Sequence, residues 1–397
     1  MPPRISSLIR YATLAGLVLL AGCQSLGRPE ANAMSALATH AVPALPRPVA
    51  MHEFTLNPGD DVVGSVQVVR ARDEDTLSDI ARRFNVGYEE IVSANPGVDP
   101  WLPGAGTEIV IPTEFVLPDA KRQGIVINLA AMRLFYFPKM KPGEPQKVIT
   151  HPIGIGRTGW RTPEGSTRIV SKTAAPTWTP TPAIRKEHAA DGDPLPKVVP
   201  PGPDNPMGTN ALRLGWPEYA IHGTDKPPSI GLRGTHGCLR MYPEDIVGIY
   251  DAVPVGTPVT VVNQPFLVGW QGDTLVMQTY PVLKDDKRKP HPDQLINLAR
   301  KKPTQGGHGA RANVVVNGAL VAAITNKPRA VAVPISTANL TLEQYLAAAL
   351  RVENELPLNA TWDGDTSRQL TAADGMKQAE APRYQSRLPG GRDGDVR

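Results

Sequence analysis

Residues 221–241 hold one cysteine and two histidines at short spacing. His236 lies two residues before Cys238, and His222 lies sixteen residues before it. A cysteine at its ordinary pKa is only a few per cent thiolate at neutral pH, so nucleophilic use needs a base or a cation beside it. Histidine titrates near pH 7 and can supply that base. The spacing therefore predicts a thiol nucleophile at Cys238.

Glycines flank these side chains at Gly223, Gly234 and Gly237. Glycine lets the backbone turn sharply and lets a ligand approach closely. We therefore expect backbone N–H groups around Gly237 and Cys238 to meet an oxyanion that develops during an acyl transfer.

The same residue types also occur in settings without acyl transfer. A buried cysteine can be inert, and a glycine-flanked turn can hold histidine and cysteine by coincidence. A structural zinc site needs about four ligands, whereas the whole chain has two cysteines. We expect no metal and no organic cofactor.

The composition is that of a globular protein, with 41% hydrophobic and 20% charged residues. A length of 397 residues suggests two or three domains. The net charge of +4 is mild. It suits an anionic wall or membrane surface, and no basic stripe indicates nucleic-acid binding.

The N-terminus indicates export. Arg4 and Arg10 precede an uncharged, mostly apolar run at residues 11–20. A bilayer core needs about 20 apolar residues, so this run is too short to span it. It fits the central region of a secretory signal instead.

Leu-Ala-Gly-Cys at residues 20–23 closes that run. It resembles the lipobox of bacterial lipoproteins, which implies a signal peptide at 1–22 and a lipid on Cys23. Gln24, where an inner-membrane retention signal carries Asp, points to a periplasm-facing protein anchored in the outer membrane. Residues 23–64 are rich in Ala and Pro and predict a tether.

Residues 65–113 predict strand, helix, helix and strand. Residues 66–69 and 108–112 have strand patterns. Residues 77–84 carry a helical apolar stripe behind an Asp-Thr cap, and 88–94 predict a second short helix. We expect this segment to have a core separate from the rest.

The segment resembles a LysM module, a binding unit for N-acetylglucosamine polymers such as peptidoglycan. The resemblance rests on residues 75–81, 84–86, 94–96 and 109–112. It implies glycan contacts at Asp75, Thr76 and Asn95. Arg-Asp-Glu at 72–74 replaces the glycine that usually precedes the Asp-Thr pair.

Residues 124–263 have a strongly β pattern. Strands are predicted at 125–129, 133–137, 148–150, 167–171 and 258–263. Residues 177–210 interrupt them with a long proline-dense stretch. Long loops in compact domains are usually functional or disordered, and we expect this one to form a lid or cleft wall beside the active site.

The chemistry-bearing residues also carry a family resemblance. His-Gly at 222–223, followed by Thr-His-Gly-Cys-Leu-Arg at 235–240, resembles the YkuD-type L,D-transpeptidase signature. The order of secretory signal, LysM module and catalytic domain is similar to the ErfK/YbiS/YcfS/YnhG-like subgroup. The implied fold is multidomain and mainly β, with a small βααβ LysM-like domain before a sandwich-like catalytic domain.

The resemblance implies roles for the site residues. Cys238 attacks a peptide carbonyl, and His222 takes the thiol proton while the Gly223 carbonyl holds its ring. His236 supports the thiolate or oxyanion, with Gly237 beside it. Substrate contacts are expected from Arg240, which orients a carboxylate, and from Thr235 and Trp178.

The implied reaction cleaves the bond between diaminopimelate and D-Ala in tetrapeptide stems of peptidoglycan. The acyl group then passes from the cysteine to an amine, which belongs to another diaminopimelate (a 3-3 cross-link) or to a lysine of an outer-membrane lipoprotein. Two alternatives remain: a wall-binding lipoprotein without catalysis, and an L,D-carboxypeptidase that uses water as acceptor.

The C-terminal third is less informative. Residues 264–356 predict a subdomain of uncertain role, with helices near 293–300 and 342–353 and strand-like runs in 312–325. Residues 357–397 are polar and glycine-rich, and we expect them to be disordered.

Overall fold

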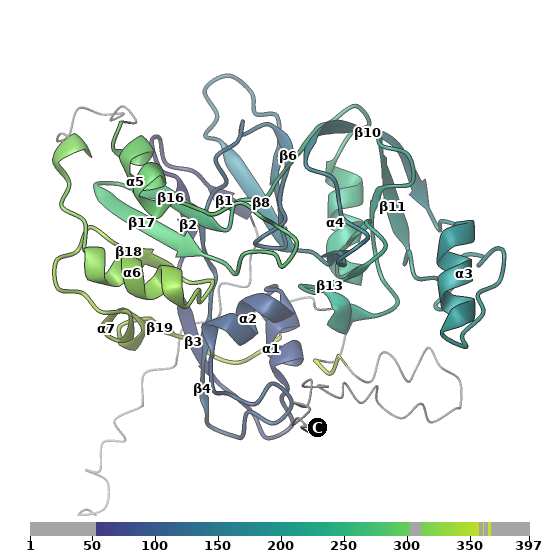
Figure 1. The fold of residues 1–397 in the computed structure, drawn as a ribbon, viewed down its shortest axis with the longest axis horizontal. Coiled ribbons are helices and arrows are strands. Elements are labelled where there is room, and N and C mark those ends of the chain that lie inside the picture. Colours follow the sequence, from purple (N-terminus) through teal and green to yellow (C-terminus); the bar gives the residue numbers. More distant parts are fainter. Residues whose placement is uncertain (1–52, 302–310, 357–359, 361–363, 367–397) are drawn as a thin grey trace, which may run out of the picture. The chain divides into compact units, whose positions relative to one another are not determined.

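The computed structural model describes residues 53–301, 311–356, 360 and 364–366 (Figure 1). The predicted signal peptide, Cys23, most of the tether and the tail beyond residue 366 lie outside the described residues. Within the described part, no helix is both long and apolar enough to cross a membrane.

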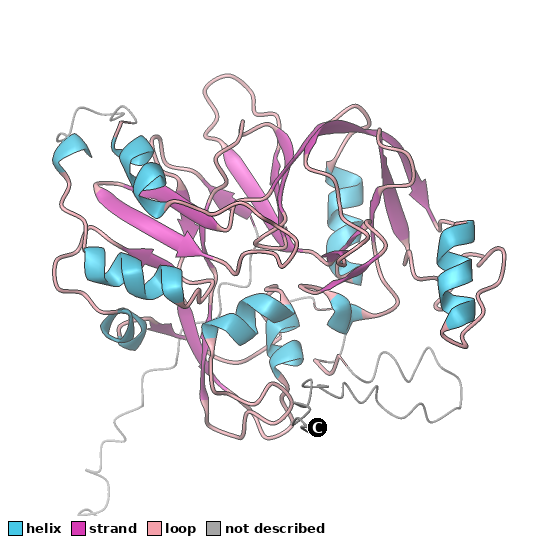
Figure 2. Ribbon diagram, viewed as in Figure 1, coloured by secondary structure: helices cyan, strands magenta, loops and turns pink. Residues whose placement is uncertain are grey.

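Nine strands of the described chain form one mixed sheet (Figure 2). In spatial order they are β1 (Glu53–Thr55), β8 (Lys147–Pro152), β7 (Arg133–Phe137), β6 (Gly124–Asn128), β15 (Pro258–Val262), β10 (Gly165–Ala174), β11 (Asn210–Leu214), β12 (Ala220–His222) and β14 (Leu239–Arg240). Neighbours pair antiparallel except β6 with β15 and β12 with β14, which are parallel. The expectation of a mainly β catalytic domain is confirmed.

One face of this sheet carries the main core. Side chains that alternate along its strands, such as Ile125, Ile127 and Leu212, are fully buried there. Helix α4 (Pro243–Ala252) adds Ile246 and Ile249 to the same core. Its proline at the first turn and its early acidic residues suit a helix N-terminus.

The LysM-like segment folds as β3 (Gln67–Arg70), α1 (Leu77–Arg83), α2 (Tyr88–Ala94) and β4 (Glu108–Ile111). Thr76 and Asp79 form a reciprocal capping box at the start of α1. A third strand, β19 (Leu350–Arg351), pairs parallel to β3. The helix expected over 342–353 is therefore too long. Helix α7 (Leu342–Ala347) ends at Ala347, and the chain then joins the LysM sheet as β19.

The C-terminal region forms another sheet from β16 (Phe266–Gln271), β17 (Thr274–Thr279) and β18 (Ala332–Pro334), with α5 (Pro292–Arg300) against β16. The strand-like interpretation of 312–325 is wrong, because Gly318–Asn326 form helix α6. Asn317 caps it, and Leu320, Val321 and Ile324 lie on one buried face. A short apolar run fits a helix or a strand equally well, and packing against the rest of the chain favours the helix here.

Three expectations about domain organisation also need correction. The predicted tether overlaps folded chain, since β1 belongs to the nine-stranded sheet and β2 (Val62–Gly64) pairs with β5 (Glu114–Val116). The LysM-like segment has a core of its own around Leu77 and Phe84. It is not isolated, however, because Val66 and Ala94 are buried in another cluster with Trp270. Residues 364–366 of the expected disordered tail also contact α1, where the Thr366 amide donates to Asp79.

Three more short elements lie within residues 221–241 or contact them. Strands β9 (Ile155–Gly156) and β13 (Arg233–Thr235) pair in parallel. Helix α3 (Pro182–Ala190) lies inside the proline-dense stretch.

Candidate active site

The parallel pair of β12 and β14 positions the candidate nucleophile and base. Ile221 lies opposite Leu239, and His222 lies opposite Arg240. Ile221 and Leu239 point into the main core. Because side chains alternate along a strand, His222 and Arg240 lie on the other face, and Cys238, two residues before Arg240, is on that face too.

An apolar cluster surrounds Cys238 on this face. Met207, Ala211 and Ala220 are its buried members, and Trp178 and Cys238 pack against them. Trp178 comes from the proline-dense stretch, where it pairs with Val199. The stretch expected to be a lid or cleft wall thus lies beside the thiol.

His222 is buried, and its Nδ1 lies 2.7 Å from the carbonyl oxygen of Gly223. A carbonyl only accepts, so the neutral ring carries its proton on Nδ1 and keeps a lone pair on Nε2. Burial, reinforced by the Arg240 guanidinium, lowers the pKa of His222 to about 3. The ring is therefore neutral at pH 7, with the lone pair of Nε2 unprotonated.

Cys238 is a partly exposed thiol whose pKa is raised by burial, and Arg213 and Arg240 oppose that rise. Its Sγ donates a hydrogen bond to the carbonyl of Glu218 at 3.3 Å. Glu218 has φ of +70°, an uncommon conformation for a residue other than glycine. The resting thiol is thus protonated, and a base must remove its proton.

Two threonines fix the loop that carries Cys238. The Thr235 hydroxyl donates to the Cys238 carbonyl at 2.6 Å and accepts from the Gly237 amide at 3.0 Å. Thr162 donates to the Gly237 carbonyl at 2.8 Å. The Gly237 amide thus already has an acceptor within the loop, and its position gives no support to the expected oxyanion role. The buried Thr235 likewise holds the loop rather than a substrate.

Gly237 is nevertheless required by the backbone. Its φ is +105°, and a Cβ there would lie 2.7 Å from the ring of Tyr219. A side chain would therefore displace either the loop or Tyr219.

His236 lies on the other side of the loop from the core and contacts a charged pair. Its Nε2 is 3.2 Å from Arg157 and 3.2 Å from Glu187, which themselves form an ion pair. Trp160 packs edge-on to its ring, with centroids 4.8 Å apart. Burial, followed by the nearby Arg157, lowers the pKa of His236 to about 4. Glu187 belongs to α3, so the proline-dense stretch meets the catalytic motif here as well.

Arg213 is a site residue that the sequence patterns did not indicate. It lies opposite Ala220 in the β11–β12 pair, on the same face as Cys238. Like Arg240, it lowers the pKa of both Cys238 and His222. The alternation Ala-Leu-Arg-Leu at 211–214 was the one signal for it, but that alternation names no partner strand.

Arg240 lies where a substrate anion can be bound. Burial lowers its pKa, while Asp225 and Cys238 oppose the shift. Its Nε is buried and has no hydrogen-bond partner among the described residues. A carboxylate on this face would supply one.

The three residues predicted to contact glycan have internal partners instead. Asp75 is buried against Arg83 and accepts from Asn354, and Thr76 caps α1. The Asn95 amide group donates to the carbonyls of Ile91 and Val110, and its oxygen accepts from the Val110 amide. These side chains hold the fold, so the prediction that they bind sugar is not supported by their positions.

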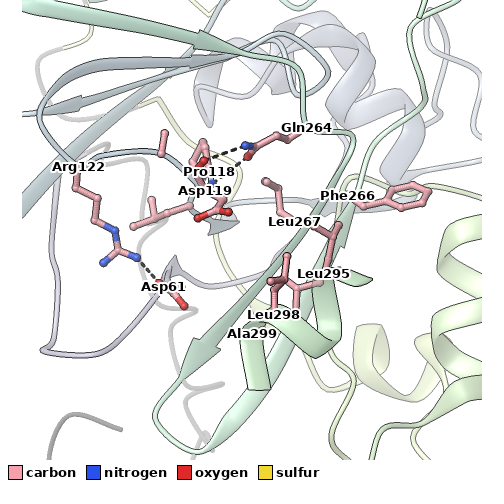
Figure 3. A pocket seen from close by; sticks show the side chains of 13 residues that line it. Asp61, Pro118, Asp119, Arg122, Gln264, Phe266, Leu267, Leu295, Leu298 and Ala299 are labelled. Carbon is pink, nitrogen blue, oxygen red and sulfur yellow. Dashed lines mark hydrogen bonds and ion pairs between the residues drawn. The ribbon is translucent and has the colours of Figure 1, made fainter. Parts of the chain in front are cut away.

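A pocket elsewhere in the chain does not involve the catalytic motif (Figure 3). It is lined by Phe266 and Leu267 of β16 and by Leu295 and Leu298 of α5. Its polar groups bind one another: Arg122 pairs with Asp61, and Gln264 and Asp119 exchange two hydrogen bonds. We assign no chemistry to it. No group of three or more metal-binding side chains occurs among the described residues.

A thiol and a neutral, backbone-oriented imidazole that share one face of a mainly β domain are the elements of a cysteine acyltransferase site. Comparison with known proteins agrees with that class. Residues 122–261 match the family model of the L,D-transpeptidase catalytic domain (YkuD), and residues 69–112 match that of the LysM domain.

Curated relatives carry the same description. The probable L,D-transpeptidase YbiS of Escherichia coli strain K12 is 47% identical over 52% of this chain and 67% of its own length. The probable L,D-transpeptidase YcfS of the same strain is 43% identical over 57% of this chain and 71% of its own length. Among solved structures, the NMR structure of the catalytic domain from the E. faecium L,D-transpeptidase is 23% identical, with a TM-score of 0.27, over 36% of this chain and 100% of that one.

The chain belongs to the YkuD family of L,D-transpeptidases and carries a LysM domain. The resemblance, the fold class and the enzyme class inferred from the sequence are confirmed. The chain spans about two thirds of the length of the curated relatives named above.

Proposed function

We propose that this chain cleaves the diaminopimelate–D-Ala bond of peptidoglycan tetrapeptide stems and transfers the acyl group to an amine. The observation that carries the proposal is the shared face of β11, β12 and β14. It places a thiol, a neutral histidine with a fixed tautomer, and the cations of Arg213 and Arg240 together.

The first half-reaction forms a thioester. Nε2 of His222 takes the thiol proton as Sγ of Cys238 attacks the carbonyl of diaminopimelate. The tetrahedral intermediate collapses, the C–N bond to D-Ala breaks, and the proton on His222 passes to the leaving amine. Diaminopimelate is left as a thioester on Cys238, and the base is again neutral.

The second half-reaction reverses these roles. An acceptor amine attacks the thioester carbonyl and His222 takes the amine proton. The C–S bond breaks as the new amide forms, and the departing thiolate of Cys238 takes that proton back from His222. Arg240 orients a substrate carboxylate, because its charge and its unpaired Nε lie beside the thiol. Trp178 provides an apolar wall next to Sγ.

The acceptor decides the product. A diaminopimelate amine gives a 3-3 cross-link, and a lysine of an outer-membrane lipoprotein gives an attached protein. The test is incubation of the full chain with purified tetrapeptide stems, with and without an amine acceptor, followed by mass spectrometry of the muropeptides. Release of D-Ala with only tripeptide products would identify an L,D-carboxypeptidase, and intact stems would leave wall binding alone.

We further propose a periplasm-facing enzyme held to the outer membrane by lipid on Cys23, next to glycan that the LysM domain binds. The lipobox-like sequence at residues 20–23 supports this. Several acyl chains together anchor a protein stably, at about 0.8 kcal/mol per buried CH₂. Mass spectrometry of the mature N-terminus tests it, since a form that starts after Cys23 without lipid would make the enzyme soluble in the periplasm.

A further inference from the structure

Helix α2 of the LysM domain begins directly against the loop that leads into the catalytic motif. The amide of Tyr88 donates to the carbonyl of Ile230 at 3.1 Å, and the amide of Glu89 donates to that of Gly231 at 3.2 Å. The first amides of a helix have no partner inside the helix. Here two carbonyls of the catalytic domain satisfy them.

The backbones at this contact meet without side chains between them. A Cβ added to Gly231 would lie 2.2 Å from the Tyr88 nitrogen, and φ of Gly231 is +81°. A Cβ added to Gly87 would lie 2.9 Å from the Gly231 Cα. Neither position has room for a methyl group while the two backbones stay in place.

The opposite side of the same loop is bound to the catalytic sheet. Gly231 donates to Ile153 at 3.2 Å, and Leu232 accepts from Ile155 at 3.0 Å. Strand β13 starts at the next residue, Arg233, and runs into the loop that carries His236 and Cys238. The LysM helix on one side and the sheet on the other therefore fix the start of the catalytic motif.

A buried ion pair holds the first turn of α2 in this position. Arg133 contacts both carboxylate oxygens of Glu90, at 2.9 Å and 2.7 Å, and the two side chains are 0% and 3% exposed. Glu90 also accepts from the Gly87 amide at 2.8 Å. A paired and fully hydrogen-bonded charge of this kind resists displacement, because either partner alone would be left unpaired in the interior.

We infer that the LysM domain of this chain positions the catalytic motif, with the Tyr88 and Glu89 amides and the Gly87–Gly231 contact as its points of action. Wall binding and acyl transfer then depend on one rigid unit rather than on two tethered modules. The inference rests on Cys238 being the nucleophile of the proposed function.

The test removes one hydrogen bond at a time from the full chain. Tyr88→Pro deletes the N–H that reaches Ile230, at the first helical position, where proline is tolerated. Gly87 before it is extended, with φ −82° and ψ 157°, as a residue before proline should be. Tyr88→Ala is the matched control, because it loses the same ring and keeps the N–H.

Two readouts follow Cys238 in each variant. One is its rate of alkylation by iodoacetamide across pH, resolved for the Cys238 peptide by mass spectrometry. The other is the rate of acylation by tetrapeptide. For Tyr88→Pro we expect a shifted alkylation midpoint and a tenfold to hundredfold slower acylation, on the order of what a displacement of about 1 Å costs. Tyr88→Ala should match the parent in both.

Gly87→Ala is the second variant, since its methyl group separates α2 from Gly231 in a backbone conformation that alanine adopts. The inference is overturned if a folded Tyr88→Pro or Gly87→Ala protein keeps the parent's pH midpoint of Cys238 alkylation and its rate of acylation. Unfolding of both, with Tyr88→Ala folded, also overturns it, because the contact would then only stabilise the fold. A shifted midpoint in a protein that never acts on tetrapeptide refutes the proposed function instead.

Discussion

The carbonyl oxygen of Gly223 lies 2.7 Å from Nδ1 of His222, the residue next to it in the chain. The ring is therefore oriented by its own neighbour rather than by an acidic side chain. An aspartate in this place would raise the affinity of the ring for a proton. The Gly223 carbonyl also raises the pKa of the ring, but burial outweighs it and the pKa stays at about 3. The ring is therefore unprotonated across the whole neutral range.

Replacement of Cys238 by Ser should remove acylation without unfolding the chain. A serine hydroxyl lacks the acidity of a thiol, and the partner of the His222 ring is the neutral Gly223 carbonyl, which cannot make up the difference. We expect a loss of about 10³-fold or more. The acyl-enzyme mass after incubation with tetrapeptide or a carbapenem measures it, and retained turnover in Cys238→Ala would refute the mechanism.

Replacement of His222 should slow acylation more than replacement of His236. A general base contributes roughly 10²–10⁴-fold, while His236 is held by Arg157 and Glu187 at the rim of the loop. Acylation rates of His222→Ala and His236→Ala give the comparison. An equal loss in both, or an unchanged alkylation profile of Cys238 in His222→Ala, would contradict the assigned roles.

His222 should make the fold sensitive to acid. Its pKa is about 3 in the folded chain and about 6.5 when unfolded. Between these values the unfolded state binds the proton and the folded state does not, so the free energy of unfolding falls as pH falls. From pH 7 to pH 4 this residue contributes a loss of up to about 3 kcal/mol.

Urea denaturation at pH 7, 5 and 4 measures this dependence. The His222→Gln protein should lose less stability over that range than the parent, because its side chain does not titrate. A parallel loss in the two proteins would show that other groups determine acid unfolding.

Breaking the buried ion pair of Glu90 and Arg133 should lower the free energy of unfolding far more than breaking an exposed ion pair. Glu90→Gln leaves the Arg133 charge without its partner in the interior and should cost about 3–5 kcal/mol. Glu108→Gln breaks the Arg351–Glu108 pair, whose side chains are each 46% exposed, and should cost about 1 kcal/mol or less. Similar urea midpoints for the two variants would contradict this ranking.

The sequence predicted those parts of the site that are local in the chain. The His-Gly pair fixes the His222 ring, and the Thr-His-Gly-Cys loop closes on itself through Thr235. Residues that reach the site through strand pairing or packing were harder to find. Arg213 depends on the β11–β12 register, and the contact of Glu187 with His236 depends on where α3 docks.

The same distinction applies to the fold. An Asp-Thr cap and apolar spacing predicted α1, and a second short helix was predicted at the residues that form α2. The shared cores were not predicted, because they depend on contacts between distant segments: Asn354 binds the carbonyl of Arg70 across 284 residues of chain. Local patterns carry no information about such partners.

Strand β19 has a consequence for how the molecule is made. The LysM sheet gains its third strand, and its core gains Val352, only from the far end of the chain. Synthesis proceeds from the N-terminus, so residues 67–70 have one open strand edge until residues 350–352 have been made. An open edge recruits strands from other chains. Nascent molecules are thus most prone to aggregate in the interval before β19 emerges, and a product truncated before β19 would remain in that condition.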